Sequence, residues 1–306
     1  MEQCRKRVLV LIGLPGSTKS TYANNIKEMN KSCMILSNDI QGKKHINMID
    51  KCLEIYDTII IDNTNLTNRS RSVYEKYDPE YIYFESSIDH CIIRILTRMY
   101  KKYYNIFFDG ISIERDTHVF PITVLFTMYN KIELPLNYTK ITMPPPCFPY
   151  KNKGLFLNID KCIQYTSHLE YKYPTCAKDV LIINTDIVKL MIDKYISLDY
   201  NIIGISDQEG ISKGIVSNDD VMKCMNETRK RLGYTESQFP ICWCSHQAFP
   251  LKCYCKKPQI GLFVYCCEKY EINPNISMYI GSCKIDEMCA EKIGMKFVYS
   301  NVFFKV

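Results

Sequence analysis

A glycine-rich segment near the start of the chain carries the residue types that bind a nucleotide phosphate. Residues 13–21 read Gly-Leu-Pro-Gly-Ser-Thr-Lys-Ser-Thr, close to the pattern G-x-x-x-x-G-K-[ST]. In such a loop, backbone N–H groups at a helix N-terminus surround the phosphates, a lysine neutralises their charge and a hydroxyl binds Mg²⁺. The predicted nucleotide-binding residues are Gly13, Gly16, Ser17, Thr18, Lys19, Ser20 and Thr21, with Ser20 as the magnesium ligand.

One position in this segment departs from the pattern. Thr18 stands where the last glycine of the pattern belongs. Because this position begins a predicted helix, we expect a β-branched residue to fit there sterically, although it can crowd the nucleotide. A simple glycine-rich turn is the alternative interpretation. The location between a buried strand and a helix favours a phosphate loop.

Two carboxylates follow predicted strands further along the chain. Asp39 ends Ser-Asn-Asp after the second strand, where a carboxylate can take the proton of an attacking hydroxyl. Asp62 begins Asp-Asn-Thr-Asn after the third strand, where it can hold the Mg²⁺ shell or a bridging water. The alternatives are a helix N-cap for Asp39 and a turn residue for Asp62. We therefore predict a general base at Asp39 and a nucleotide-site residue at Asp62.

A cysteine and histidine cluster in the second half has the composition of a metal site. Two close pairs, Cys244-x-His246 and Cys253-x-Cys255, supply three thiolates and one imidazole. Four such ligands suit a closed tetrahedral Zn²⁺ site, which is structural because no open position remains for a substrate. Ordinary reduced thiols are the alternative, and Cys242 could replace Cys244 as a ligand.

The elements that must position these residues alternate between strand and helix. Continuous apolar runs, such as residues 7–13, are expected of strands buried on both faces of a parallel sheet. The alternation therefore predicts an α/β fold. Predicted strands cover residues 7–13, 32–36, 58–62, 81–84, 154–159, 201–205, 278–280 and 296–299, and predicted helices cover 20–29, 89–104, 188–195 and 218–232.

A proline-rich stretch divides the chain. Residues 143–149 read Met-Pro-Pro-Pro-Cys-Phe-Pro, which breaks regular structure and is typical of a linker. The strand and helix alternation restarts after it. We therefore predict two α/β domains, residues 1–147 and 148–306.

Composition limits the function classes. The chain has 306 residues and a formal net charge of +6, which suits a globular protein without a long basic arm. No apolar run approaches the roughly 18 residues of a membrane span, and the apolar residues 8–14 lead into the glycine-rich loop rather than a cleavage site. We expect a cytoplasmic or nuclear protein that is not secreted and binds no membrane. In that compartment the 16 cysteines favour metal ligands or reduced thiols over disulfides.

The first half resembles the kinase domain of bifunctional polynucleotide kinase/phosphatases. The resemblance rests on Gly-Leu-Pro-Gly-x-x-Lys-Ser-Thr, Ser-Asn-Asp39 and Ile-Asp62-Asn-Thr-Asn, and it covers about residues 7–145. It implies transfer of the ATP γ-phosphate to a 5′-hydroxyl end of DNA or RNA, as in end repair. It also implies phosphate and Mg²⁺ roles for Lys19 and Ser20. Arg94 and Arg98 resemble the lid arginines of this family, which neutralise transition-state charge; a solvated helix face is the alternative.

The second half resembles the aspartate-nucleophile phosphatases of the haloacid dehalogenase superfamily. The branch that it resembles holds histidinol-phosphate and heptose-bisphosphate phosphatases and the phosphatase half of polynucleotide kinase/phosphatases. In that branch a Cys-x-His…Cys-x-Cys loop also precedes the catalytic lysine. The matching positions are Asn158, Asp160, Ser206, Lys257, Ser282 and Asp286. Because Asn158 and Ser282 replace two of the four acids, the resemblance implies a degenerate site that is inactive or nearly so.

Three functions therefore remain open from the sequence. The first is an ATP-dependent polynucleotide 5′-hydroxyl kinase that acts on nucleic-acid ends and carries a degenerate 3′-phosphatase domain. The second is a kinase of a small acceptor, such as a nucleoside or a sugar, which the modest charge does not exclude. The third is a non-catalytic nucleotide-binding scaffold, which Thr18 leaves open. The implied cofactors are ATP, Mg²⁺ and structural Zn²⁺, and the sequence leaves the oligomeric state open.

Overall fold

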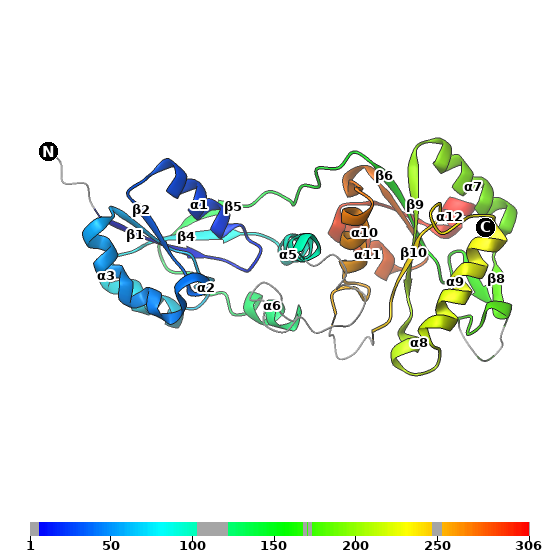
Figure 1. The fold of residues 1–306 in the computed structure, drawn as a ribbon, viewed down its shortest axis with the longest axis horizontal. Coiled ribbons are helices and arrows are strands. Elements are labelled where there is room, and N and C mark those ends of the chain that lie inside the picture. The colour runs from blue at the N-terminus through cyan, green and yellow to red at the C-terminus, as the bar shows by residue number, and fades with distance from the viewer. Residues whose placement is uncertain (1–5, 103–121, 168–169, 171–172, 247–252, 306) are drawn as a thin grey trace. The chain divides into compact units, whose positions relative to one another are not determined.

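The computed structural model describes residues 6–102, 122–167, 170, 173–246 and 253–305. The chain forms two compact units (Figure 1). The first comprises residues 1–95 and 113–146, and the second comprises residues 96–112 and 147–306. In the part of the chain that the model describes, every helix is too short or too polar to span a bilayer.

The first unit is built on a five-stranded parallel sheet. Its order is β2-β3-β1-β4-β5. The strands are β1 (Arg7–Ile12), β2 (Cys33–Leu36), β3 (Thr58–Ile61), β4 (Glu80–Glu85) and β5 (Thr139–Thr142). Because all pairs are parallel, the segments that follow β1, β2 and β3 leave the sheet at the same edge. The phosphate loop, Asp39 and Asp62 lie in these three segments.

Helices cover both faces of this sheet. Leu9 and Leu11 of β1 pack with Ala23 of α1, whereas Val8 and Val10 point to the other face and pack with Ile49 of α3. This alternation follows from the two-residue period of a strand. The helices are α1 (Lys19–Met29), α2 (Asn38–Gln41), α3 (His45–Ile55), α4 (Asn68–Arg71), α5 (Ile88–Lys102), which runs on into the second unit, and α6 (Ile122–Tyr129).

The second unit has its own five-stranded parallel sheet and a small hairpin. The sheet order is β10-β9-β6-β11-β12. Its strands are β6 (Lys153–Asn158), β9 (Tyr200–Asp207), β10 (Ile241–Cys244), β11 (Met278–Gly281) and β12 (Lys296–Tyr299). The antiparallel hairpin comprises β7 (Gln164–Thr166) and β8 (Val180–Ile182). The carboxyl ends of β6, β9 and β11 therefore meet at one edge.

The central strand of this second sheet is buried from both sides. Leu155 and Leu157 of β6 face a core that includes residues of α7, α9 and α12, while Phe156 packs on Phe263 of α10 with ring centroids 5.7 Å apart. Figure 1 shows α10 and α11 on one side of the sheet and α7 and α9 on the other. The helices are α7 (Thr185–Ser197), α8 (Glu209–Ser212), α9 (Asn218–Leu232), α10 (Gly261–Lys269), α11 (Lys284–Ile293) and α12 (Ser300–Phe304).

The predicted α/β class with parallel sheets is confirmed. All eight predicted strands are present, with ends shifted by at most three residues, and each predicted helix overlaps an observed one. The end of the predicted helix 89–104 lies partly outside the described residues. The prediction omitted the strands β5, β7, β8 and β10 and, besides several short helices, the helices α3, α6 and α11.

Candidate active sites and metal centre

The glycine-rich segment forms a loop between β1 and α1. The Lys19 side chain is buried, and its Nζ donates hydrogen bonds to the carbonyl oxygens of Gly13 (2.9 Å) and Leu14 (2.8 Å). Gly16 has a φ of 81°, and a Cβ on it would lie 2.6 Å from the Cys91 carbonyl oxygen, so this position requires glycine. Ser20 is exposed in the first turn of α1. The loop thus has an ammonium inside it and a hydroxyl at the helix start.

The backbone conformation of Thr18 is not the helical one that the sequence predicts. The helix begins at Lys19, and Thr18 is the preceding cap residue with φ 68° and ψ 16°. This is the left-handed region, where a β-branched side chain is strained. In addition, its Oγ1 is buried without a hydrogen-bond partner among the described residues. Threonine therefore occupies this position in a strained conformation directly before the helix, and the conformation explains why the general pattern has glycine here.

We expect Thr18→Gly to stabilise the first unit. Glycine adopts a positive φ without strain, which costs threonine about 1–3 kcal/mol, although glycine also loses more backbone entropy on folding. The net gain in the free energy of unfolding should be about 1 kcal/mol, measurable by urea denaturation. Thr18→Ala is the control, because it removes the unpaired hydroxyl but keeps the Cβ. A glycine variant less stable than the alanine variant would contradict the strain argument.

The two predicted carboxylates lie after neighbouring strands. Asp39 is exposed in the first turn of α2, and the N-cap of that helix is Ser37, whose Oγ accepts from Ile40 N at 3.2 Å. The N-cap alternative for Asp39 is therefore wrong. Asp62 is half-buried directly after β3, and its backbone N donates to Leu36 O at 2.9 Å. The ends of β2 and β3 are thus tied together at the edge where the phosphate loop leaves β1.

The residues after Asp62 bind both neighbouring segments. The Asn65 Nδ2 donates to Leu11 O of β1 at 2.8 Å, and Thr64 O accepts from Gly13 N at 3.0 Å. On the other side, Asn63 Oδ1 accepts from the backbone N of Asn38 at 2.7 Å. The segment 62–65 therefore connects the phosphate loop to the start of α2.

The two predicted lid arginines differ in their surroundings. Arg94 is half-buried, and its Nη1 donates to Gly16 O (3.2 Å) and Ser86 Oγ (3.0 Å). Its Nη2 donates to Pro144 O. Arg94 thus contacts the phosphate loop directly, unlike a residue on a solvated face. Arg98 is exposed, in the part of α5 that belongs to the second unit.

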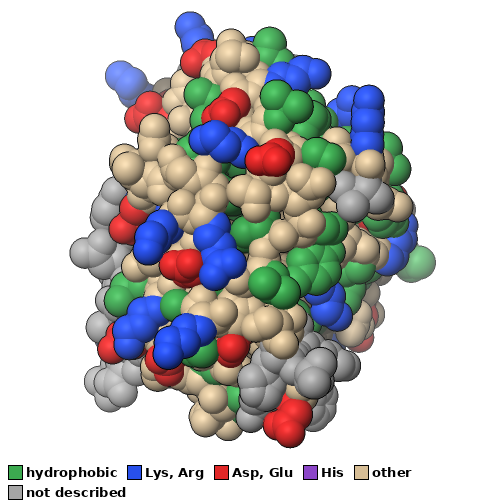
Figure 2. Space-filling model, turned by 90° about the vertical axis from the view of Figure 1, so that its right-hand side faces the viewer, with side chains coloured by type: hydrophobic (Ala, Val, Ile, Leu, Met, Phe, Trp, Pro, Cys, Tyr) green, Lys and Arg blue, Asp and Glu red, His purple; other side chains and the backbone are tan. Residues whose placement is uncertain are grey.

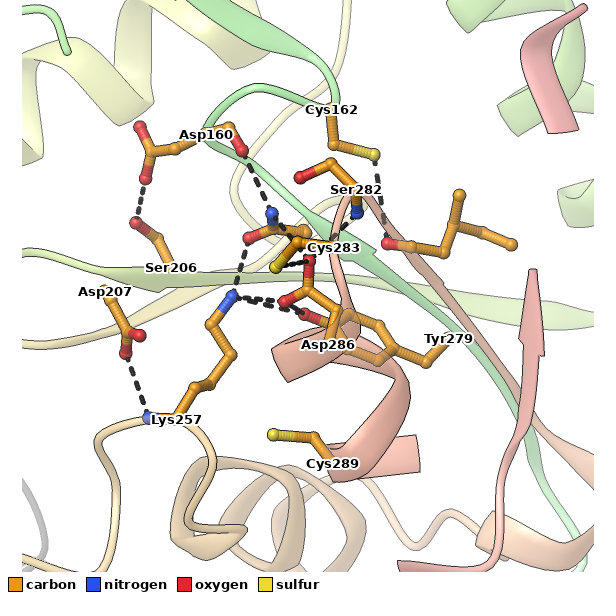
Figure 3. Close-up of polar contacts among 12 residues, drawn as sticks. Asp160, Cys162, Ser206, Asp207, Lys257, Tyr279, Ser282, Cys283, Asp286 and Cys289 are labelled. Atoms are coloured by element: carbon orange, nitrogen blue, oxygen red, sulfur yellow. Dashed lines mark hydrogen bonds and ion pairs between the residues drawn. The ribbon is translucent and has the colours of Figure 1, made fainter. Parts of the chain in front are cut away.

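In the second unit, three of the predicted phosphatase-site positions, Asn158, Lys257 and Ser282, contact Asp286 (Figure 3). Its Oδ1 accepts from Lys257 Nζ (2.7 Å) and Tyr279 OH (2.8 Å). Its Oδ2 accepts from Ser282 N (2.9 Å), Asn158 Nδ2 (3.3 Å) and Cys283 Sγ (3.4 Å). Burial alone would raise the pKa of Asp286, but the Lys257 ammonium and the hydrogen bonds from Ser282 N and Tyr279 OH together keep that pKa below its usual value.

Asp160 has a separate set of donors. Its Oδ2 accepts from Ser206 Oγ and from Gln208 Nε2 (2.9 Å), and its Oδ1 accepts from Gln164 Nε2 (3.2 Å). Burial raises the pKa of Asp160. The sequence analysis missed Gln164, Gln208 and Tyr279. Gln208 lies two residues after Ser206, and Tyr279 lies in the predicted strand 278–280 just before Ser282, so two of the three lie beside recognised positions.

These residues do not fit the Mg²⁺ that the phosphatase resemblance implies. Magnesium needs free oxygen ligands in a near-octahedral shell. Both oxygens of Asp286 already accept hydrogen bonds from within the protein. Asn158 offers an amide whose Oδ1 accepts from Lys257 Nζ at 3.0 Å. The Lys257 ammonium is therefore the cation that these two oxygens, Asn158 Oδ1 and Asp286 Oδ1, contact in this structure.

Four metal-ligating side chains lie together at the end of β10 and beyond. The ligand atoms of Cys244, His246, Cys253 and Cys255 all lie within 4.8 Å of one another. The Cys255 Sγ is 3.4 Å from Cys244 Sγ and 3.3 Å from His246 Nδ1, and Cys244 Sγ is 3.8 Å from Cys253 Sγ. Ligands around a tetrahedral ion with bonds of about 2.3 Å are about 3.8 Å apart. The cluster can therefore hold a metal ion, and Cys242 is not part of it.

Comparison with known proteins gives matches only among solved structures. No family model and no curated protein matches the chain. The D,D-heptose 1,7-bisphosphate phosphatase from B. bronchiseptica, complexed with magnesium and phosphate, is 16% identical with a TM-score of 0.41, over 47% of this chain and 78% of that chain. A structure of the Pnkp1/Rnl/Hen1 RNA repair complex is 11% identical with a TM-score of 0.31, over 96% of each chain.

Proposed function

We propose that the chain is an ATP-dependent kinase that phosphorylates the 5′-hydroxyl end of DNA or RNA. The observation that carries this proposal is the common edge of the first sheet. There the loop with Lys19 and Ser20 follows β1, Asp62 follows the adjacent β3, and Asp39 follows β2 beyond it. A phosphoryl-transfer site needs a phosphate loop, a metal-shell carboxylate and a proton acceptor at one place.

The roles of these residues follow from their chemistry. The Lys19 ammonium and the backbone N–H groups of the loop hold the phosphates of ATP, and Ser20 with Asp62 serves the magnesium shell. Asp39 takes the proton of the acceptor hydroxyl while the oxygen of that hydroxyl bonds to the γ-phosphorus. The bond from that phosphorus to the β,γ-bridging oxygen breaks, and ADP leaves. Arg94, which contacts the loop through Gly16 O, neutralises the charge of the transferred group, and the same role for Arg98 stays a prediction of the sequence.

The nature of the acceptor rests on the resemblance of the motifs. A 5′ end needs a local contact rather than a long basic surface, in keeping with the net charge of +6. Figure 2 shows a face on which Lys and Arg side chains are interspersed with Asp and Glu. This face lies at the side of the second unit that carries α7 and α9 in Figure 1, and it has no uniformly basic track.

An acceptor comparison tests the proposal. Radiolabelled ATP and Mg²⁺ are incubated with the full chain and a 5′-hydroxyl DNA oligonucleotide, its RNA counterpart, a 5′-phosphorylated control, a nucleoside and a sugar. We expect label on the 5′-hydroxyl oligonucleotides alone. Label on the nucleoside or sugar instead would favour a small-molecule kinase. ATP binding without transfer to any acceptor would indicate a non-catalytic nucleotide-binding protein.

We further propose that the second unit is catalytically inactive. An aspartyl-phosphate mechanism needs a carboxylate nucleophile, and Asn158 is an amide held by Lys257 and Asp286. A 3′-phosphorylated oligonucleotide with Mg²⁺ should therefore release no phosphate above the level of a blank reaction. The double variant Asn158→Asp, Ser282→Asp is assayed beside the natural chain, because it restores both missing acids. Robust turnover by the natural chain would refute the proposal.

We propose that the cluster of Cys244, His246, Cys253 and Cys255 holds a structural Zn²⁺. Three thiolates and an imidazole are typical zinc ligands and leave no open coordination position. The purified protein should contain about one zinc per chain by elemental analysis. Treatment with a strong chelator should lower the melting temperature of the second unit, and added zinc should restore it. Cys255→Ser should show a similar loss, whereas the exposed Cys176→Ser should not. Equal stability with and without the chelator would contradict this site.

A further inference from the structure

A single buried histidine is tied to both ends of the short helix that carries Asp39. His45 is 5% exposed, and its Nδ1 lies 2.7 Å from the carbonyl oxygen of Gly42, the residue directly after α2. Its Nε2 lies 3.1 Å from Nδ2 of Asn63. The Oδ1 of the same Asn63 accepts from the backbone N of Asn38, the first residue of α2.

The chemistry of each group determines the direction of these bonds. A carbonyl oxygen can only accept, so His45 Nδ1 carries the proton and donates to Gly42 O. A backbone N–H can only donate, so the oxygen of Asn63 faces Asn38 and the Asn63 amide nitrogen donates to His45 Nε2. The whole chain of bonds is therefore consistent with a neutral imidazole that donates at one nitrogen and accepts at the other.

The helix α2 is too short to be stable through its own hydrogen bonds alone. It has four residues, Asn38–Gln41, whereas isolated helices shorter than about 12 residues are marginal in water. Its own side chains supply only the Ser37 cap and a bond from Ser37 N to Gln41 Oε1 at 2.8 Å. The position of Asp39 thus depends on contacts from outside α2, and those of Asn63 and His45 reach its two ends.

We propose that His45 and Asn63 are positioning residues that hold Asp39 in place as the general base. This inference rests on the proposed kinase function. Asn63 lies in the segment 62–65, which also binds the phosphate loop through the bond from Gly13 N to Thr64 O. The same segment therefore fixes the distance between the phosphate-binding loop and the base. A general base must lie within about 2.6–3.2 Å of the hydroxyl it deprotonates.

Steady-state kinetics with 5′-hydroxyl oligonucleotides test this assignment. Asn63→Ala should lower kcat about 10- to 100-fold, because a misplacement of about 1 Å costs roughly that factor. The dissociation constant of ATP should stay within about twofold, because Asn63 makes no contact with Lys19 or Ser20 among the described bonds. Circular dichroism and the melting temperature identify any variant that fails to fold.

Two histidine variants separate the two bonds without removing a polar side chain. His45→Asn places a donor near the position of Nδ1, and His45→Gln places an acceptor near the position of Nε2. Each should recover part of the kcat lost in His45→Ala. His45→Asn can keep the bond to Gly42 O, and His45→Gln can keep the bond from Asn63 Nδ2. Asp50→Asn is the matched control: Asp50 lies in the same helix as His45, is exposed and pairs with Lys76 at 3.3 Å, so kcat should stay within about twofold.

The outcomes distinguish this inference from the function on which it rests. An active wild type whose Asn63→Ala and His45→Ala variants keep their kcat would overturn the positioning role and leave the kinase intact. A wild type that phosphorylates no acceptor would overturn both. Reduced kcat with unchanged ATP affinity in Asn63→Ala, together with partial recovery in His45→Asn or His45→Gln, supports the assignment.

Discussion

Replacing Asp39 by asparagine should lower kcat for 5′-hydroxyl phosphorylation by about 10²- to 10⁴-fold, the range that a general base contributes. The amide has nearly the same shape but cannot take the proton of the attacking hydroxyl. Because Asp39 is exposed and is not the N-cap of α2, the change should leave the fold and the affinity for ATP intact. Single-turnover transfer from radiolabelled ATP measures the effect directly.

Two comparison variants separate loss of the general base from loss of ATP binding and from a nonspecific effect of removing a carboxylate. Lys19→Ala should weaken ATP binding as well as transfer, since it removes the ammonium at the centre of the loop. Asp50→Asn is the matched control, because Asp50 is an exposed carboxylate of the same unit whose ion-pair partner is the surface residue Lys76 at 3.3 Å. Equal transfer rates in Asp39→Asn and Asp50→Asn would show that the base is assigned wrongly.

Replacing Lys257 by methionine should destabilise the second unit by about 3–5 kcal/mol, the cost of leaving a buried charge without its partner. The side chain of Lys257 is 8% exposed and that of Asp286 is fully buried, and their charged groups are 2.7 Å apart. Methionine preserves much of the volume but leaves the Asp286 carboxylate without its cation. Urea denaturation followed by circular dichroism measures the loss.

A double variant and a surface control complete this experiment. Lys257→Met combined with Asp286→Leu should recover part of the stability, because the buried carboxylate that paired with Lys257 is then removed as well. Lys284→Met should change the free energy of unfolding by less than about 1 kcal/mol, because its pair with Glu287 lies at the surface. A loss below about 1 kcal/mol in Lys257→Met would indicate that the ion pair is hydrated.

The sequence predicted the parts of the fold that have strong local signals. The strands β1 and β3 are uninterrupted apolar runs, so their burial on both faces could be inferred before the structure was known. The strand β5 reads Thr-Lys-Ile-Thr and lies, mostly exposed, at the edge of its sheet, so its pattern resembles a loop. Edge strands pair through backbone groups that composition does not reveal.

The site was predictable where a motif concentrates several residues. The phosphate loop and the metal cluster are each contained in fewer than fifteen consecutive residues. His45, Asn63 and Tyr279 were missed because each acts through a partner that is distant in the sequence or through the backbone. The left-handed conformation of Thr18 was missed as well, since the type of residue gives no indication of strain that the surrounding structure imposes.

The metal cluster is bonded to both parts of the degenerate site. The backbone oxygen of Cys244 accepts from Gln208 N at 2.7 Å, and Gln208 in turn binds Asp160. On the other side, Cys253 Sγ accepts from Lys256 N at 3.4 Å, next to Lys257. These segments should therefore open together as one cooperative unit in native-state hydrogen exchange. Their amides should share one opening free energy, and loss of the metal should lower it for all of them at once.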